Sequence, residues 1–218
     1  ETQYQKLKDL GFAFRVIERI NETVKDLDNK TGQFVSSTLG PNYASLELNS
    51  EYFKSPELFS SKRGELIVTI GHELMHMAQF SMDPRYALTK AKLPYPTLWM
   101  DEALATWYEA LALEQNNHIA SNAERNKGFV GTPLMFPPAP ALYPLGDLTP
   151  VQDHGYGASL FIRYLAAQDR YGPFFPAEIY AELAAGARSG GEALSLALDR
   201  HMTAFGADPS RSSRNNKR

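Results

Sequence analysis

Near the start of the chain, apolar residues recur at intervals of three and four. They are Leu7, Leu10, Phe14, Ile17, Ile20, Val24 and Leu27. This spacing predicts an amphipathic helix over residues 3–28 with a charged opposite face. A turn is expected at 29–32, followed by two short strands at 33–38 and 43–48. In the second strand apolar and polar residues alternate, which is typical of a strand with one buried face.

Helical patterns dominate the rest of the chain. A polar stretch at 54–60 leads into a helix expected at 61–80, with a serine near its start as the N-cap. Residues 128–155 hold six prolines and little periodicity, so we expect a long loop that is either functional or mobile. Further helices are expected at 98–115, 156–170, 174–185 and 191–204.

These elements predict an α+β fold with a small N-terminal sheet and one long helix, followed by a mainly helical part. No linker divides the chain, so we expect a single domain over 1–206, with its α/β part at about 1–83 and its helical part at about 84–206. The basic residues of 207–218 have no apolar neighbour to fold on, and we expect a flexible tail there.

Composition narrows the classes of function. The 218 residues are enough to bury a full core, and the net charge of -3 gives no basic field for nucleic acid. The chain has no cysteine, which excludes a thiol nucleophile, a cysteine-ligated zinc site and a disulfide scaffold. Its apolar stretches fall short of the ~18 residues that span a bilayer, so no membrane span is expected. The chain begins at Glu1 without a methionine, and we expect a trimmed mature protein or a piece of a longer one that acts outside the cell or at the cell envelope.

The stretch from Gly71 to His76 reads Gly-His-Glu-Leu-Met-His. His72 and His76 lie one helical turn apart and therefore on one face, which suits tetrahedral zinc. Glu73 stands beside the first histidine, where it can take a proton from a zinc-coordinated water. The same pattern also occurs by chance on solvated helices. Here the helix is apolar over most of its circumference, and buried polar groups without partners cost about 1–3 kcal/mol each, which favours a metal site.

A third ligand is needed downstream. Gln79 and Met82 stand where a metzincin would have glycine and histidine, which rules out that class. Residues 99–105 read Trp-Met-Asp-Glu-Ala-Leu-Ala, and they offer the carboxylates of Asp101 and Glu102. The alternative is that these two acids only stabilise the N-terminus of a helix.

A helical His-Glu-x-x-His followed by Trp-x-x-Glu-Ala-x-Ala resembles the gluzincin metallopeptidases. Within them the chain is similar to the minimal, hyicolysin-like peptidases of the thermolysin-like clan. The resemblance covers about residues 60–175 and implies a zincin-like fold, a Zn²⁺ cofactor, and Glu102 as third zinc ligand with His72 and His76. It also implies peptide hydrolysis by metal-activated water with Glu73 as general base. Ala103 stands where these proteins commonly have glycine.

The helix that begins near His154 is similar to a tyrosine-bearing helix of the same clan. The resemblance implies that Tyr156 stabilises the oxyanion of the tetrahedral intermediate by donating a hydrogen bond, with His154 as the second candidate. A tyrosine at the start of a helix can equally serve packing alone.

Other polar residues leave alternatives open. Thr106 or Glu109 could accept the second ring N–H of a zinc-binding histidine, because they lie one and two turns after Glu102. His118 and His201 are expected to be surface histidines and not ligands.

Three functions compete with a peptidase: hydrolysis of another substrate class, a zinc-stabilised protein-binding domain without turnover, and a helical interaction domain without metal. We expect a peptide or protein substrate, which would pair with the strand at 43–48 if that strand forms the edge of the sheet.

Overall fold

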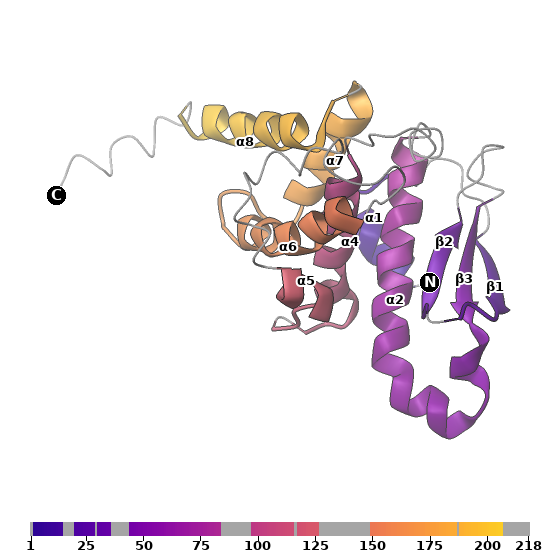
Figure 1. Ribbon diagram of the computed structural model, residues 1–218. Coiled ribbons are helices and arrows are strands. Elements are labelled where there is room, and N and C mark those ends of the chain that lie inside the picture. The colour runs from indigo at the N-terminus through magenta and orange to yellow at the C-terminus, as the bar shows by residue number, and fades with distance from the viewer. Residues whose placement is uncertain are drawn as a thin grey trace.

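The structure is a computed structural model, and it describes residues 2–14, 20–28, 30–35, 44–83, 97–115, 117–126, 149–186 and 188–206 (Figure 1). The elements in these ranges are α1 (Thr2–Asp9), β1 (Asn21–Lys25), β2 (Gly32–Val35), β3 (Ser45–Asn49), the 3-10 helix η2 (Ser50–Phe53), α2 (Pro56–Met82), α4 (Leu98–Ala112), α5 (Ser121–Asn126), α6 (Thr149–Ala166), α7 (Phe175–Ala185) and α8 (Gly190–Gly206). The α+β class is confirmed: the fold is mostly helical, with a small mixed sheet. The predicted tail at 207–218 lies outside the described residues.

The helix predicted over 3–28 is wrong beyond its first two turns. α1 ends at Asp9, and Gly11 adopts a left-handed conformation with φ +92°. Its N–H donates to the carbonyl of Lys8, in a turn that closes the helix because glycine takes positive φ without a steric penalty. Residues 21–25 then form β1, where the β-branched Thr23 and Val24 suit an extended backbone. The apolar residues keep their spacing of three and four through this strand by coincidence.

The three strands have the order β1-β3-β2, with β3 parallel to β1 and antiparallel to β2. The condition that residues 43–48 form the edge of the sheet is therefore not met, because β3 pairs on both sides. β2 makes most of the contacts between the sheet and α2. Its Gly32 lies so close that a Cβ there would be 2.7 Å from the Thr69 side chain, and the rings of Phe34 and Phe80 lie 5.8 Å apart.

α2 separates the sheet from the other helices (Figure 1). It begins at Pro56, five residues before the predicted start at Ser61, because Ser55 caps it by accepting the N–H of Leu58 and proline is well suited to the first helical turn. It runs on to Met82, and none of the helices in the described ranges combines the length and apolar character that crossing a membrane requires.

α4 is the central helix and is buried on nearly all sides between α2 and α6. α6 begins at Thr149, so the end of the predicted loop is helical, with Pro150 in the first turn, where its missing N–H costs nothing. The remainder of that loop lies outside the described residues. The short helix α5 was not predicted.

Candidate metal centre

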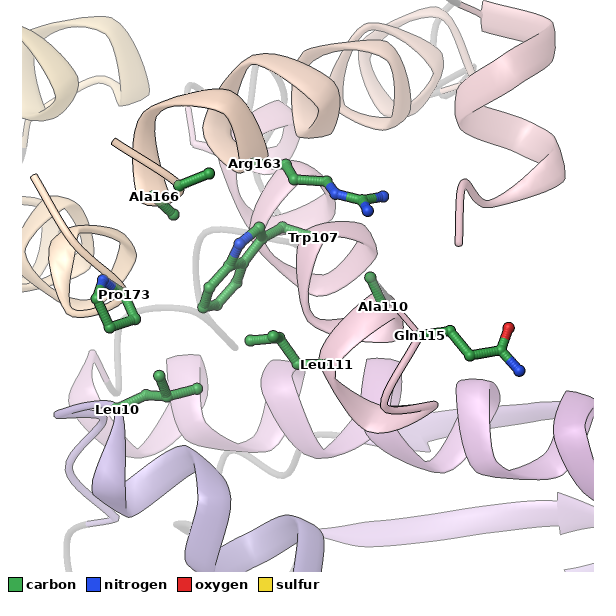
Figure 2. A pocket seen from close by; sticks show the side chains of 9 residues that line it. Leu10, Trp107, Ala110, Leu111, Gln115, Arg163, Ala166 and Pro173 are labelled. Carbon is green, nitrogen blue, oxygen red and sulfur yellow. The ribbon is translucent and has the colours of Figure 1, made fainter. Parts of the chain in front are cut away.

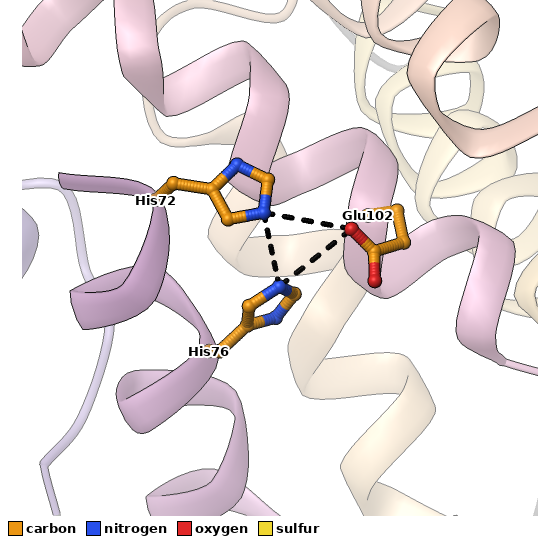
Figure 3. A group of neighbouring side chains, drawn as sticks. All are labelled: His72, His76 and Glu102. Carbon is orange, nitrogen blue, oxygen red and sulfur yellow. Dashed lines mark hydrogen bonds and ion pairs between the residues drawn. The ribbon is translucent and has the colours of Figure 1, made fainter. Parts of the chain in front are cut away.

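Three side chains from two helices converge on one point. His72 and His76 project from α2, and Glu102 projects from α4 toward them (Figure 3). The two Nε2 atoms lie 3.2 Å apart, and Oε2 of Glu102 lies 3.5 Å from His72 Nε2 and 3.7 Å from His76 Nε2. In the described part of the chain this is the group of ligand atoms arranged to hold a metal ion.

The spacing of these atoms fits a tetrahedral ion. Ligand atoms about 2.0–2.2 Å from zinc, at tetrahedral angles, lie about 3.3–3.6 Å from one another. The three separations in the protein, 3.2, 3.5 and 3.7 Å, bracket that range. The donor set of two imidazoles and one carboxylate is one that zinc favours, although the geometry alone does not select the metal.

A side-chain oxygen contacts Nδ1 of each imidazole and so orients the ring. His72 Nδ1 lies 2.8 Å from Oε1 of Glu109, and His76 Nδ1 lies 2.8 Å from Oε1 of Gln79. Both oxygens accept the Nδ1 proton, which places the lone pair of each ring on Nε2, facing the metal position. Gln79 is fixed in turn, since its Nε2 donates to the carbonyl of Asp101 at 2.9 Å. Of the two predicted acceptors the structure thus selects Glu109.

Glu102 is held from its other side. Gln152 Nε2 of α6 donates to its Oε1 at 3.2 Å, so Oε2 is turned toward the two imidazoles. Burial would raise the pKa of Glu102, but His76 and His72 outweigh it and hold this pKa well below its ordinary value. Burial would lower the pKa of His72, but Glu102 and Glu109 outweigh it and raise this pKa well above its ordinary value. The surrounding carboxylates therefore favour a positive charge at this point.

Glu73 lies beside the cluster without joining it. Its side chain is half-buried, and its Oε2 accepts the backbone N–H of Phe34 at 2.7 Å. Strand β2, which packs against α2, thus holds this carboxylate through one backbone hydrogen bond. Glu73 is not among the three residues whose ligand atoms converge, and its role as general base stays a prediction.

The two oxyanion candidates on α6 have different surroundings. Burial and the charges of Glu102, Asp153 and Glu73 raise the pKa of Tyr156 well above its ordinary value, which places its phenol in the field of the cluster. The His154 ring is buried and packs edge-on against Trp99, with ring centroids 5.2 Å apart. Side chains two residues apart on a helix point about 200° away from each other, so His154 and Tyr156 lie on different faces of α6.

Neither His118 nor His201 belongs to the cluster, but neither is a simple surface residue. The side chain of His118 is 20% exposed and its Nε2 lies 3.6 Å from Oε2 of Glu109. His201 is 21% exposed, and its Nε2 lies 2.6 Å from Oε2 of Glu178.

The sequence interpretation also missed Gln79 and Gln152 as supporting residues. Gln79 could have been found, because it lies three residues after His76 on the same face. Gln152 could not, because its position depends on how α6 packs.

Among the cavities that border α4, two differ clearly in their lining. One, of about 540 Å³, is lined by Thr31, Glu65, Val68, Thr69, Glu109, Leu113, His118, Ile119, Ala120, Ser121 and Asn122. The other, of about 360 Å³, is mainly apolar, and Figure 2 shows Trp107 in the middle of its lining between Leu10 and Arg163. None of the three cluster residues lines this second cavity. None of the three cluster residues lines the first cavity either, and its link to the cluster is Glu109, which contacts His72.

The resemblance to gluzincins rests on the two helical motifs and remains a prediction. A comparison of the chain with models of protein families, with curated proteins and with solved structures finds no match.

Proposed function

We propose that this protein is a zinc-dependent peptidase that hydrolyses peptide bonds with metal-activated water. One observation carries the proposal: the Nε2 atoms of His72 and His76 and Oε2 of Glu102 converge, with the carboxylate of Glu73 beside them. Three protein ligands of this kind are typical of a catalytic zinc site, which keeps one coordination position open. A zinc ion held there would supply Lewis acidity, which lowers the pKa of a coordinated water and polarises a carbonyl oxygen.

Glu73 would act as the general base. The N–H of Phe34 fixes its carboxylate next to His72, where it can accept a proton from the attacking water and later return it to the leaving amine. A positioned base of this kind contributes a factor of about 10²–10⁴ to the rate.

Tyr156 would stabilise the oxyanion. Its raised pKa keeps the phenol protonated at neutral pH, so it can donate a hydrogen bond to a negative oxygen. His154 is the weaker candidate, because its ring is packed against Trp99.

An extended peptide would lie along β2. Among the described residues this strand pairs only with β3, and it is the strand that contacts α2 and positions Glu73. Pairing of a substrate backbone with a strand edge is a common mode of recognition, and it would bring a peptide bond next to the metal ligands.

The experiment is the substitution Glu73→Gln in the full chain. Protein purified without added zinc should contain close to one zinc per chain by elemental analysis, and it should cleave members of a peptide library. Glu73→Gln should retain the zinc and lose about 10²–10⁴-fold in cleavage rate. Glu57→Gln, at the exposed start of the same helix, is the matched control and should leave both unchanged. A wild-type protein that holds zinc and cleaves nothing would instead be a zinc-stabilised binding domain.

A further inference from the structure

Glu109 stands between two histidines. It lies in the last part of α4, its side chain is 7% exposed, and its Oε1 is 2.8 Å from Nδ1 of His72. Its second oxygen, Oε2, faces Nε2 of His118 at 3.6 Å. Each carboxylate oxygen therefore has its own imidazole, one on the ligand side and one on the far side.

The backbone around His118 is fixed by two other elements. Its N–H donates to the carbonyl of Gln115 at 3.1 Å, and its own carbonyl accepts a hydrogen bond from Nη1 of Arg163 on α6. The ring is four-fifths buried, and its Nε2 forms no hydrogen bond with the residues that the structure describes. His118 thus presents a largely buried imidazole to the outer oxygen of Glu109, at ion-pair distance.

The cavity that Glu109 and His118 line explains why such a group matters. Glu109 and His118 both line this space of about 540 Å³, which is large enough for many water molecules. A carboxylate that borders a cavity without a second partner can rotate and exchange its acceptor for water. The His118 ring covers the outer oxygen and so confines Glu109 to the orientation that His72 needs.

We propose that His118 is a positioning residue for the metal centre, acting on His72 through Glu109. The inference rests on the proposed zinc site and extends it by one residue that does not touch a ligand. Partners that hydrogen-bond a metal-binding histidine change metal affinity about 10–100-fold when removed. His118 acts one step further out, so a smaller effect of about 3–10-fold is expected from its loss.

The test measures zinc affinity of the full chain by competition with a chromophoric chelator. His118→Ala should weaken zinc binding about 3–10-fold, whereas His118→Gln should stay close to wild type, because its amide occupies similar space and can donate to the carboxylate. His201→Gln is the matched control: it changes another largely buried histidine that faces a carboxylate, and it should leave zinc affinity unchanged.

A double-mutant cycle separates positioning from a general structural effect. Glu109→Ala alone should weaken zinc binding about 10–100-fold, and adding His118→Ala to it should have no further effect, because the carboxylate that connects the two histidines is gone. Equal losses in both backgrounds would overturn the inference, as would wild-type affinity in His118→Ala.

Further outcomes distinguish a failure of this inference from the misfolding of one variant and from a failure of the proposed function. If His118→Ala does not fold, His118→Gln and His118→Leu fill the same space and differ in the donor, so equal zinc affinities in this pair would overturn the inference. A wild-type protein that takes up no zinc overturns the proposed function and this inference together. Zinc affinity that is measurable in the wild type and indifferent to the donor at position 118 overturns this inference alone.

Discussion

Gly155 lies where α6 approaches α4 most closely, and its replacement by alanine tests whether helix packing builds the metal centre. A Cβ at this position would be 2.3 Å from the carbonyl oxygen of Trp99 and 2.8 Å from Cβ of Glu102. Ordinary contacts of this kind begin near 3.4 Å. The methyl group would therefore push α6 away from α4 by about 1 Å, since a close-packed interior has no space to absorb it.

Two opposing effects set the magnitude of Gly155→Ala. Overpacking costs about 1–3 kcal/mol, and the upper part of that range applies because a main-chain carbonyl cannot rotate out of the way. Alanine regains about 1 kcal/mol over glycine in a helix interior. The free energy of unfolding should fall by about 1–2 kcal/mol, which lowers Tm by about 2–8 °C in a chain of this size. Glu102 and its partner Gln152 would separate, so zinc affinity should fall about 10-fold.

Gly64→Ala is the matched control. Gly64 is an exposed position within α2, and the nearest atom to its added Cβ is a methyl of Leu113 at 4.0 Å. This change should raise the free energy of unfolding by about 0.5–1 kcal/mol and leave zinc binding unchanged. Thermal unfolding with chelator present and zinc competition measure the two properties separately. If Gly155→Ala proves as stable as Gly64→Ala and binds zinc like the wild type, the argument from close packing is refuted.

Two further predictions concern single side chains. Tyr156→Phe should lower kcat about 10²-fold with zinc content unchanged, because one oxyanion donor is lost; a wild-type kcat would assign Tyr156 to packing. Burial alone would raise the pKa of Glu47, but its contacts with Lys25 and Gln33 lower this pKa below the ordinary 4.5. The ionised Glu47 therefore stabilises the fold above pH 4.5, and this stabilisation is lost as the pH falls through the lowered pKa. Urea unfolding between pH 7 and 3 should therefore show a smaller loss of stability for Glu47→Gln, and an unchanged pH dependence would contradict the assignment.

The three candidate ligands could be named from the sequence because two short motifs carry them. His72 and His76 share a helix, and the spacing of four residues fixes both imidazoles on one face whatever the rest of the fold does. The motif at 99–105 then supplied Glu102 by resemblance. The ligand atoms of these three side chains lie within 4.8 Å of one another, and the packing of α2 against α4 that brings them together is not encoded in either motif.

The N-terminal part was mispredicted because its pattern fits two structures. Ile20, Val24 and Leu27 have helical spacing, yet residues 21–25 pair with β3 in a parallel strand. That pairing joins segments separated along the chain, and the apolar periodicity of one segment contains no information about it. Gly11 was the local signal for the break, since its positive φ ends α1 early.

The choice between Thr106 and Glu109 shows where local reasoning ends. Both lie on the face of α4 that carries Glu102, and only the crossing of α2 over α4 decides which one reaches His72. At that crossing a Cβ on Gly71 would be 2.6 Å from the methyl of Ala112, so the helices meet more closely than any larger residue would allow. The position of this contact along α4 places Glu109, near the end of the helix, beside His72.

The same contact explains how one helix holds both sides of a single ring. Glu102 and Glu109 are seven residues apart, which is about 10 Å along α4. Oε2 of Glu102 faces Nε2 of His72, and Oε1 of Glu109 faces Nδ1 of the same ring. The imidazole therefore bridges the space between two carboxylates that α4 presents two turns apart. An increase in the distance between α2 and α4 would weaken both contacts at once, so Gly71 supports the candidate metal centre by allowing the two helices to meet this closely.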